Sequence, residues 1–289
     1  PKVLIAADGY RFSGKAFDRR PEVAEIAQAL PTLEALVWVP QFEHDPQAPV
    51  AVSQVRFDAL LDGPDLGAES FRYERVASDH PVWIVFSSGT TGLPKPIVHS
   101  HVGVLVEHLK LMTLHMDLGP GSVMFFYSTT GWMMWNLLVA ALMTGASAVL
   151  YDGSPMHGGP ECLWQLAQDT RATCFGASPT FVQMMEKAGI APGEKFDLSA
   201  LRSIVLSGAP STPETFDWFY RAVKRDLWVT SQSGGTEICS GLVGAAPLLP
   251  VHAGEIQTRM LGMAVEVWND DGQPVVDEVG ELVVTKPSP

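Results

Sequence analysis

The sequence is poor in basic residues. Lysine and arginine together number 19 against 32 aspartates and glutamates, which gives a formal net charge of −13. Proteins that bind nucleic acids need a basic surface to neutralise phosphates, so this balance argues against a nucleic-acid partner. It leaves a nucleotide ligand open, because a few local donors can hold one polyphosphate on an acidic protein.

Cysteine is also scarce, with three residues, Cys162, Cys174 and Cys239, far apart in the chain. Their spacing fits neither a metal site nor a disulfide framework, and scattered cysteines in a long chain are typical of a reducing compartment such as the cytoplasm. The eight histidines contain no H-E-x-x-H pattern. His99 and His101 flank a helix start, where a solvated or capping role is expected.

Charge is absent from one long stretch, residues 119–151. This stretch is long enough to span a bilayer, but glycine and proline interrupt it at 119–121, 131 and 145. It is better interpreted as a strand over 122–127, a helix over 133–143 and a strand over 146–151. We therefore expect a buried α/β core and no membrane association.

Alternating strand and helix signals run through most of the 289 residues. Such alternation predicts an α/β fold with parallel sheets covered by helices, in which ligands bind at the carboxyl ends of strands. The other predicted strands are 3–6, 36–39, 82–86, 172–175, 203–206 and 227–230, and the other helices are 21–30, 102–115, 160–170, 180–188 and one from Pro213.

After about Gly254 the alternating strand and helix signals give way to strand and turn signals. Residues 265–268 and 273–276 flank the turn Asn269–Gly272, which predicts a β-hairpin, and 281–285 is a further strand. We expect an α/β core over residues 1–253 and a β-rich segment over 254–289.

The strongest local signal is Phe86-Ser-Ser-Gly-Thr-Thr-Gly-Leu-Pro-Lys95, which follows a predicted strand. Its hydroxyls, flexible backbone and lysine are the groups that surround a polyphosphate. It is not a Walker A loop, because Lys95 is neither preceded by glycine nor followed by serine or threonine. Two later loops also follow predicted strands: Ser207-Gly-Ala-Pro210 and Ser233-Gly-Gly-Thr-Glu237.

In this order the three loops resemble the signatures of the adenylate-forming superfamily, which includes acyl-CoA synthetases, luciferases and peptide-synthetase adenylation domains. Residues 1–10, 254–259 and 262–266 are similar to the acetoacetyl-CoA synthetase branch. Pro96, where a glycine commonly follows the loop lysine, also resembles that branch. Enzymes of this kind continue to a ribose-binding aspartate and a small C-terminal lid domain with a catalytic lysine. We expect neither within residues 1–289, so the isolated chain should lack ligase activity.

The resemblance implies ATP, Mg²⁺ and coenzyme A as cofactor and co-substrates. It assigns catalytic roles to Lys95, Thr236 and Glu237, with Glu237 as the metal ligand. Gly208, Ala209 and Pro210 would line the adenine, while Ser233 replaces an aromatic residue that stacks on it in many relatives. The full set implied for nucleotide binding is Ser87, Ser88, Gly89, Thr90, Thr91, Gly92, Lys95, Gly208, Ala209, Pro210, Ser233, Gly235 and Thr236.

Four residues match positions near the acyl group in short-chain relatives: Trp132, Met133, Ser207 and Gly234. Gly234 stands where acetate-activating relatives carry a tryptophan that closes the pocket, so more room for the acid is expected. A tryptophan and a methionine at an apolar helix start are equally typical of a core.

The implied reaction converts a short acid, most closely acetoacetate, to an acyl-adenylate and then to a thioester of coenzyme A. Three alternatives remain: a ligase for acetate, propionate or another short acid, an amino-acid adenylation domain, and a non-catalytic AMP-binding module. The partners expected are small molecules.

Overall fold

The structure is a computed structural model and describes residues 1–42, 45–64, 67–87 and 92–288. Contacts group the chain into two compact units: Pro1–Arg75 with Gly153–Gly158, and Val76–Asp152 with Gly159–Pro289. Residues 1–253 therefore contribute to both units, and the boundary predicted near Gly254 stays a prediction.

The first unit contains a parallel sheet of order β1-β4-β5, formed by Val3–Ala7, Ala35–Val39 and Ser53–Arg56. Helix α1 (Arg20–Gln28), with proline in its first turn, supplies Val23 to a small core around Trp38. The predicted strands 3–6 and 36–39 and the helix 21–30 are confirmed. This unit also contains the hairpin β2 (Gly9–Phe12)–β3 (Lys15–Asp18), η1 (Asp58–Leu60) and α2 (Gly67–Ser70).

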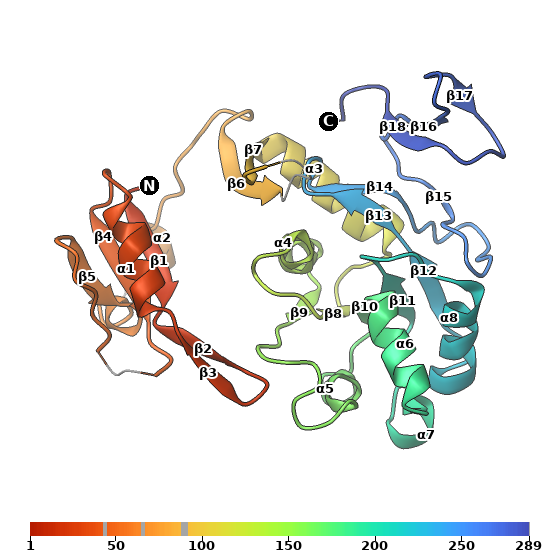
Figure 1. The fold of residues 1–289 in the computed structure, drawn as a ribbon, viewed down its shortest axis with the longest axis horizontal. Helices are drawn as coiled ribbons and strands as arrows, with labels where there is room; N and C mark the ends of the chain where they lie inside the picture. The colour runs from red at the N-terminus through yellow and green to blue at the C-terminus, as the bar shows by residue number, and fades with distance from the viewer. Residues whose placement is uncertain (43–44, 65–66, 88–91, 289) are drawn as a thin grey trace. The chain divides into compact units, whose positions relative to one another are not determined.

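The second unit is organised around a five-stranded sheet of order β12-β11-β10-β8-β9, in which every neighbouring pair is parallel (Figure 1). The sheet is covered on both faces, and parallel strands of this kind are correspondingly apolar. The predicted parallel sheet is confirmed. The strands are β8 (Val123–Phe126), β9 (Ser147–Val149), β10 (Cys174–Ala177), β11 (Ser203–Leu206) and β12 (Trp228–Ser231).

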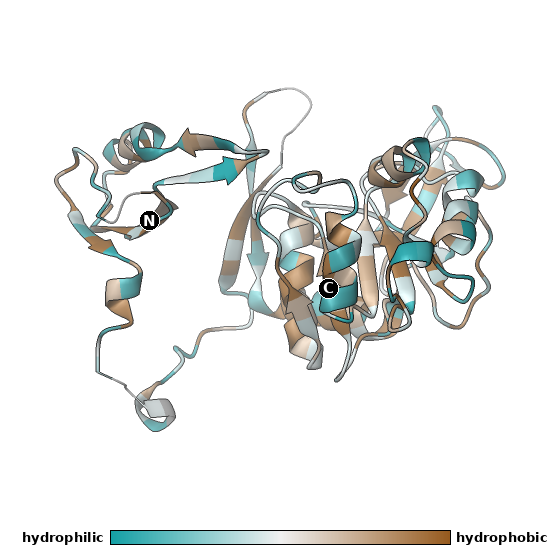
Figure 2. Ribbon diagram, turned by 90° about the horizontal axis from the view of Figure 1, so that it is seen from below, coloured by the Kyte–Doolittle hydropathy of each residue, from teal (hydrophilic) through white to brown (hydrophobic). Residues whose placement is uncertain are grey.

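The two faces of this sheet bury different helices, because successive side chains of a strand point to opposite sides. Phe125 and Phe175 pack with α5, α6 and α8, where Trp164 stacks on Phe175 at a ring-centroid distance of 4.5 Å. Met124 and Cys174 pack on the other side with α4 and with the helical segment that follows α3, residues 111–115. Figure 2 shows hydrophilic and hydrophobic stretches along the same helices, as one-sided burial requires. The helical segments are α3 (His101–Lys110), η2 (Leu111–His115), α4 (Met133–Ala140), η3 (Ala141–Thr144), α5 (Cys162–Asp169), α6 (Pro179–Lys187), α7 (Pro192–Lys195), α8 (Pro213–Trp218) and η4 (Phe219–Val223).

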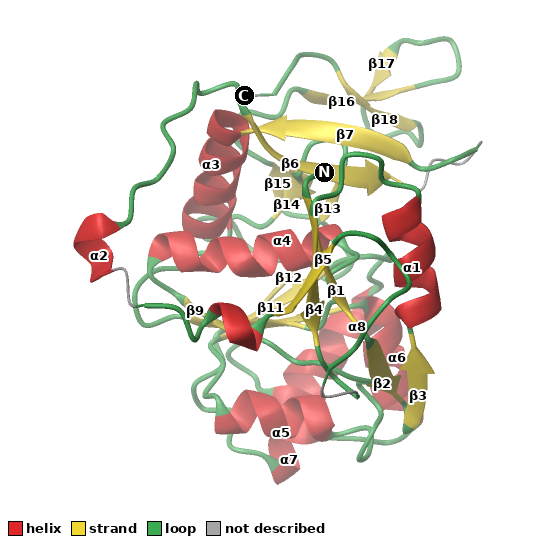
Figure 3. Cartoon of the chain, turned by 90° about the vertical axis from the view of Figure 1, so that its left-hand side faces the viewer, coloured by secondary structure: helices red, strands yellow, loops and turns green. Residues whose placement is uncertain are grey.

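The charge-free stretch folds as predicted into strand β8, a loop, helix α4 and strand β9. Helices α3 and α4 pack against each other beside the sheet (Figure 3). Among the helices that the structure describes, none is both long enough and apolar enough to cross a membrane.

Antiparallel pairs add what the sequence pattern did not indicate. β7 (Lys95–Ser100) returns along β6 (Pro81–Ser87), so the Ser/Gly/Thr loop connects two strands before α3 begins. A loop was also predicted over 233–237, but β13 (Ser233–Gly235) pairs with β14 (Ser240–Gly244), which pairs with β15 (Thr258–Arg259). The predicted C-terminal hairpin is confirmed as β16 (Val265–Trp268) and β17 (Pro274–Val275), with β18 (Glu281–Val284) on the other edge of β16.

His115, the last residue of η2, connects this helical segment to the residues that follow β14 and β15. The side chain is 3% exposed, and its Nδ1 lies 2.7 Å from the carbonyl oxygen of Ala245. Its Nε2 lies 3.1 Å from the backbone nitrogen of Leu261. Nδ1–H therefore donates to Ala245, and Nε2 accepts from Leu261.

Replacing His115 should destabilise the protein far more than replacing an exposed histidine. His115→Ala leaves the carbonyl oxygen of the buried Ala245 without its partner, at about 1–3 kcal/mol, and also removes the bond from the amide of Leu261. His252→Ala, at an exposed site, is the control. Urea unfolding measures both, and equal free energies of unfolding for the two variants would contradict this role of His115.

Candidate active site

The first part of the site is the hairpin formed by β6 and β7. Ser87 ends β6 and pairs with Lys95, which starts β7, so the two residues face each other across the base of the Ser/Gly/Thr loop. Gly92 and Lys95 are exposed. The predicted nucleotide-binding residues Ser88, Gly89, Thr90 and Thr91 lie outside the described residues.

The second part is the turn between β13 and β14, which carries Thr236 and Glu237. The amide of Cys239 donates to the carbonyl oxygen of Thr236 over 3.3 Å and closes the turn. The same oxygen lies 2.9 Å from Nε2 of His99, which comes from β7. The turn is thereby fastened to the hairpin that holds Ser87 and Lys95.

Glu237 is the charged group at the meeting point of these two parts. A hydrogen bond from the Ser87 hydroxyl is the main reason why the pKa of Glu237 is lowered, with smaller contributions from His99 and Lys95. The carboxylate is exposed. It is therefore ionised at neutral pH and accessible to a cation.

Two buried side chains, His108 and Cys239, hold the turn between β13 and β14 in place. Nε2 of His108 lies 2.9 Å from the carbonyl oxygen of Cys239, and burial lowers the pKa of His108. Burial also raises the pKa of the Cys239 thiol to about 11, and its sulfur lies 3.7 Å from that of Met133. A neutral histidine thus connects the turn to α3, and a protonated thiol connects it to the start of α4.

The third part is the Ser207–Pro210 loop, which follows β11. Gly208 has a φ of +95°, in the region that favours glycine, and this lets the chain turn sharply toward α8. The loop lines a cavity of about 580 Å³ together with Ser233 and Gly234. All three residues predicted to contact adenine, Gly208, Ala209 and Pro210, belong to this lining.

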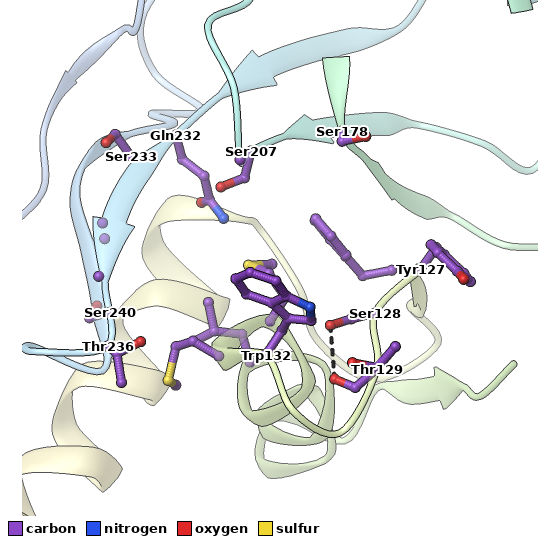
Figure 4. Close-up of a pocket in the computed structure, with 18 residues that line it drawn as sticks. Tyr127, Ser128, Thr129, Trp132, Ser178, Ser207, Gln232, Ser233, Thr236 and Ser240 are labelled. Atoms are coloured by element: carbon purple, nitrogen blue, oxygen red, sulfur yellow. Dashed lines mark hydrogen bonds between the residues drawn. The ribbon is translucent and has the colours of Figure 1, made fainter. Parts of the chain in front are cut away.

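A second cavity, of about 480 Å³, adjoins the first, because both are lined by Ser207, Gly208, Gln232, Ser233 and Gly234. It contains all four predicted acid-binding residues, Trp132, Met133, Ser207 and Gly234. Trp132 is 70% exposed, so it belongs to the cavity wall rather than to the core (Figure 4). Gly235 and Thr236 also line this cavity.

Gly234 has a structural constraint besides its place in the cavity wall. A Cβ atom at this position would lie 2.1 Å from the carbonyl oxygen of Ser240 and 2.6 Å from Cα of Gly241. The close approach of β13 to β14 therefore requires glycine. The extra room predicted from the missing tryptophan stays a prediction.

Several residues of the site were not identified from the sequence. Gln232 directly precedes the Ser233 loop, so its position after a strand was an available signal. Ser240 enters the cavity wall through the β13–β14 pairing, and no local pattern indicates it. His99 was interpreted as solvated or capping, but its ring bonds the Thr236 carbonyl.

The donor set around Glu237 fits a hard cation shared with phosphates. Among the described residues, no group of three or more His, Cys, Asp or Glu side chains could hold a metal ion. Mg²⁺ is commonly bound by one or two carboxylates, several waters and substrate phosphates. A single ionised carboxylate beside Ser87, at the base of the Ser/Gly/Thr loop, matches that pattern.

Removing the Ser87 hydroxyl should raise the pKa of Glu237. Ser87→Ala deletes its strongest stabilising contact, whereas Lys95→Met deletes a weaker charge interaction and should raise the pKa less. NMR titration of the Glu237 carboxyl carbon measures both shifts, with Ser128→Ala as the control. A larger shift in the Lys95 variant would show that charge, not the hydrogen bond, dominates.

Gly234→Ala should lower the melting temperature, because its Cβ meets backbone atoms that cannot move without separating β13 from β14. Overpacking of this kind costs about 1–3 kcal/mol. The matched control is Gly119→Ala, where a Cβ meets no atom within 4 Å. If both variants melt alike in calorimetry, the close approach of the strands is not the constraint on Gly234.

The family model described as AMP-binding enzyme matches residues 1–289. The chain is 42% identical over 292 residues to an acetoacetyl-coenzyme A synthetase of Rhizobium meliloti (strain 1021), and 38% identical over 294 residues to an acetoacetyl-CoA synthetase of Gallus gallus. Each alignment covers 100% of this chain and 44% of the relative.

A malonamoyl-CoA synthetase of Penicillium aethiopicum is 35% identical over 305 residues, covering 98% of this chain and 42% of the relative. The solved structure of an acetoacetyl-CoA synthetase from Streptomyces lividans matches with a TM-score of 0.91 and 47% identity, over 100% of this chain and 44% of that one. The chain thus spans less than half the length of these relatives. With a match over its whole length, the chain belongs to the family of AMP-binding enzymes.

Proposed function

We propose that this chain is the nucleotide- and acid-binding part of a ligase that activates acetoacetate with ATP and transfers the acetoacetyl group to coenzyme A. The observation that carries the proposal is the pair of adjoining cavities. One cavity is lined by the Ser207–Pro210 loop and would hold the nucleotide. The other, called the acid cavity below, is lined by Trp132 and Met133, and the two cavities share Ser207 and Gly234. A nucleotide and a small acid can therefore lie side by side.

In the first half-reaction, a carboxylate oxygen of the acid attacks the α-phosphorus of ATP, and pyrophosphate leaves. Two anions have to be held together, so the task of the protein is positioning and electrostatic stabilisation. Lys95 at the base of the loop would bind phosphate oxygens as a cation. Thr236, whose backbone His99 holds in place, would donate its hydroxyl to the α-phosphate.

Glu237 would hold Mg²⁺, which supplies charge neutralisation to the phosphates. The lowered pKa of Glu237 supports this role, because its carboxylate is already ionised before a metal binds. The adenine would lie against Gly208, Ala209 and Pro210. Ser233 borders both cavities, so adenine would meet a small polar residue there in place of a stacking ring.

The choice of acetoacetate is supported by the relatives named for acetoacetyl-CoA and malonamoyl-CoA synthesis. Both acyl groups carry a carbonyl at C3. A glycine at 234 is compatible with an acid longer than acetate. A ligase for acetate or propionate is the nearest alternative, and it would leave part of the cavity unfilled.

Two further alternatives are weaker. A non-catalytic AMP-binding module would not need Lys95, Thr236 and Glu237 together beside the acid cavity. An amino-acid adenylation domain would need a partner for the ammonium group, yet no acidic side chain lines the acid cavity among the described residues.

We propose that the complete ligase acts on small molecules in the cytoplasm. We also propose that the relatives' additional length includes a lid domain, without which residues 1–289 form no thioester.

The test of the proposed function is ATP–pyrophosphate exchange by the full-length protein that contains this chain. Acetoacetate should support exchange with a higher kcat/KM than acetate does, because the longer acid contacts more of the cavity wall. A preference for acetate would establish the short-acid alternative. Exchange with an amino acid alone would establish the adenylation-domain alternative, and absence of exchange with every short acid and amino acid would establish the non-catalytic one.

Glu237→Gln in the same full-length protein should lower the exchange rate by about 10²–10³, the usual loss when one preorganised electrostatic group is removed. The loss should be greatest at limiting Mg²⁺. Glu278→Gln, at an exposed position of the β-rich segment, is the control and should keep the full rate. An unchanged rate for Glu237→Gln at limiting Mg²⁺ would remove Glu237 from the metal site.

A further inference from the structure

We propose that Gln232 and Ser240 recognise the C3 carbonyl oxygen of the acid and so select 3-oxo acids over saturated acids of the same length. This inference rests on the proposed function and assigns its specificity to two residues. Both line the acid cavity, from different strands: Gln232 follows β12, and Ser240 begins β14.

The two side chains share an uncommon property: each is buried and carries a polar atom without a partner. Gln232 is 7% exposed and Ser240 is 4% exposed. Among the described residues, neither Oε1 of Gln232 nor Oγ of Ser240 forms a hydrogen bond. Buried polar groups are nearly always paired, and leaving one unpaired costs free energy that an apolar residue of similar size would avoid.

Both residues are held by their backbones, which leaves their side chains available. The amide nitrogen of Gln232 donates to the carbonyl oxygen of Leu206 over 2.9 Å. Ser240 is paired with Gly235 in the β13–β14 ladder. Figure 4 shows the side chain of Gln232 pointing into the cavity toward Trp132, with its amide nitrogen at the inner end. The unpartnered Oε1 of Gln232 can only accept, so the donor on this side chain is its amide nitrogen, which forms no hydrogen bond among the described residues either. The Ser240 hydroxyl and the Gln232 N–H₂ are thus the two groups free to donate.

The remaining lining defines what kind of group these donors can bind. Phe126, Met133 and Leu137 form an apolar part of the wall. No charged side chain lines the cavity within the described part of the chain, so a second carboxylate would be buried without a counter-ion. A neutral carbonyl oxygen with a methyl group beside it matches two donors next to an apolar wall.

Butyrate is the matched probe, because it has the chain length of acetoacetate but a methylene group at C3. Binding butyrate would bury both donors permanently without a partner. A site built to hydrogen-bond a substrate group can reject an analogue that lacks the group by up to about 10⁴–10⁵, far more than a purely apolar site can achieve.

The experiment measures kcat/KM for acetoacetate and for butyrate by pyrophosphate release from the full-length protein. Gln232→Met and Ser240→Ala remove the donors with little change in shape. Each should lower kcat/KM for acetoacetate by about 10-fold or more, while butyrate is unchanged or improves. Thr230→Val is the control, since Thr230 on β12 has an equally buried and unpartnered hydroxyl but does not line the cavity.

The melting temperatures keep these outcomes separate from misfolding, because removing an unpartnered polar atom should leave stability unchanged or raise it. Equal losses for both acids would overturn the specificity role while the proposed function stands. The specificity role would also be overturned if the wild-type protein had the same kcat/KM for butyrate as for acetoacetate. Failure of the wild-type protein to activate acetoacetate would overturn the proposed function itself, and this inference with it.

Discussion

Two histidines hold the turn on which the candidate site depends. His99 bonds the carbonyl oxygen of Thr236 at the start of the turn, and His108 bonds that of Cys239 at its end. With both ends fastened, Glu237 lies within reach of Ser87, and Thr236 lies in the wall of the acid cavity. Burial keeps His108 neutral by lowering its pKa, so it can donate to a carbonyl without burying a charge.

The order of helices and strands could be predicted from the sequence because each of them is determined largely by its own short stretch of residues. Apolar runs followed by Gly, Ser and Thr predicted the parallel sheet and the loops that follow β11 and β12. The Ser/Gly/Thr loop also follows an apolar strand, but that strand, β6, pairs with β7 outside the parallel sheet. The contacts that make these loops one site could not be predicted, because they join residues far apart in the chain. His108 and Cys239, for example, are 131 positions apart. The strands β7 and β13 were missed for a related reason, since a partner strand rather than local composition makes them extended.

Small residues explain how close the parts of the site can come. Glycine at 234 lets β13 approach the backbone of β14, and this approach brings Ser240 into the wall of the acid cavity. The glycine that is predicted to leave space for an acid thus also positions a polar group in the same cavity wall. The resemblance indicated the first effect. The second depends on a strand pairing that the sequence pattern does not show.

We propose that the nucleotide and the acid occupy the two adjoining cavities of this chain. A crystal structure of the full-length protein with a non-hydrolysable acetoacetyl-adenylate analogue tests it most directly. We expect adenine beside residues 208–210, the phosphate near Thr236, and the C3 oxygen within hydrogen-bonding distance of Gln232 and Ser240. An analogue bound elsewhere, or an acyl group pointing away from Trp132 and Met133, would contradict it.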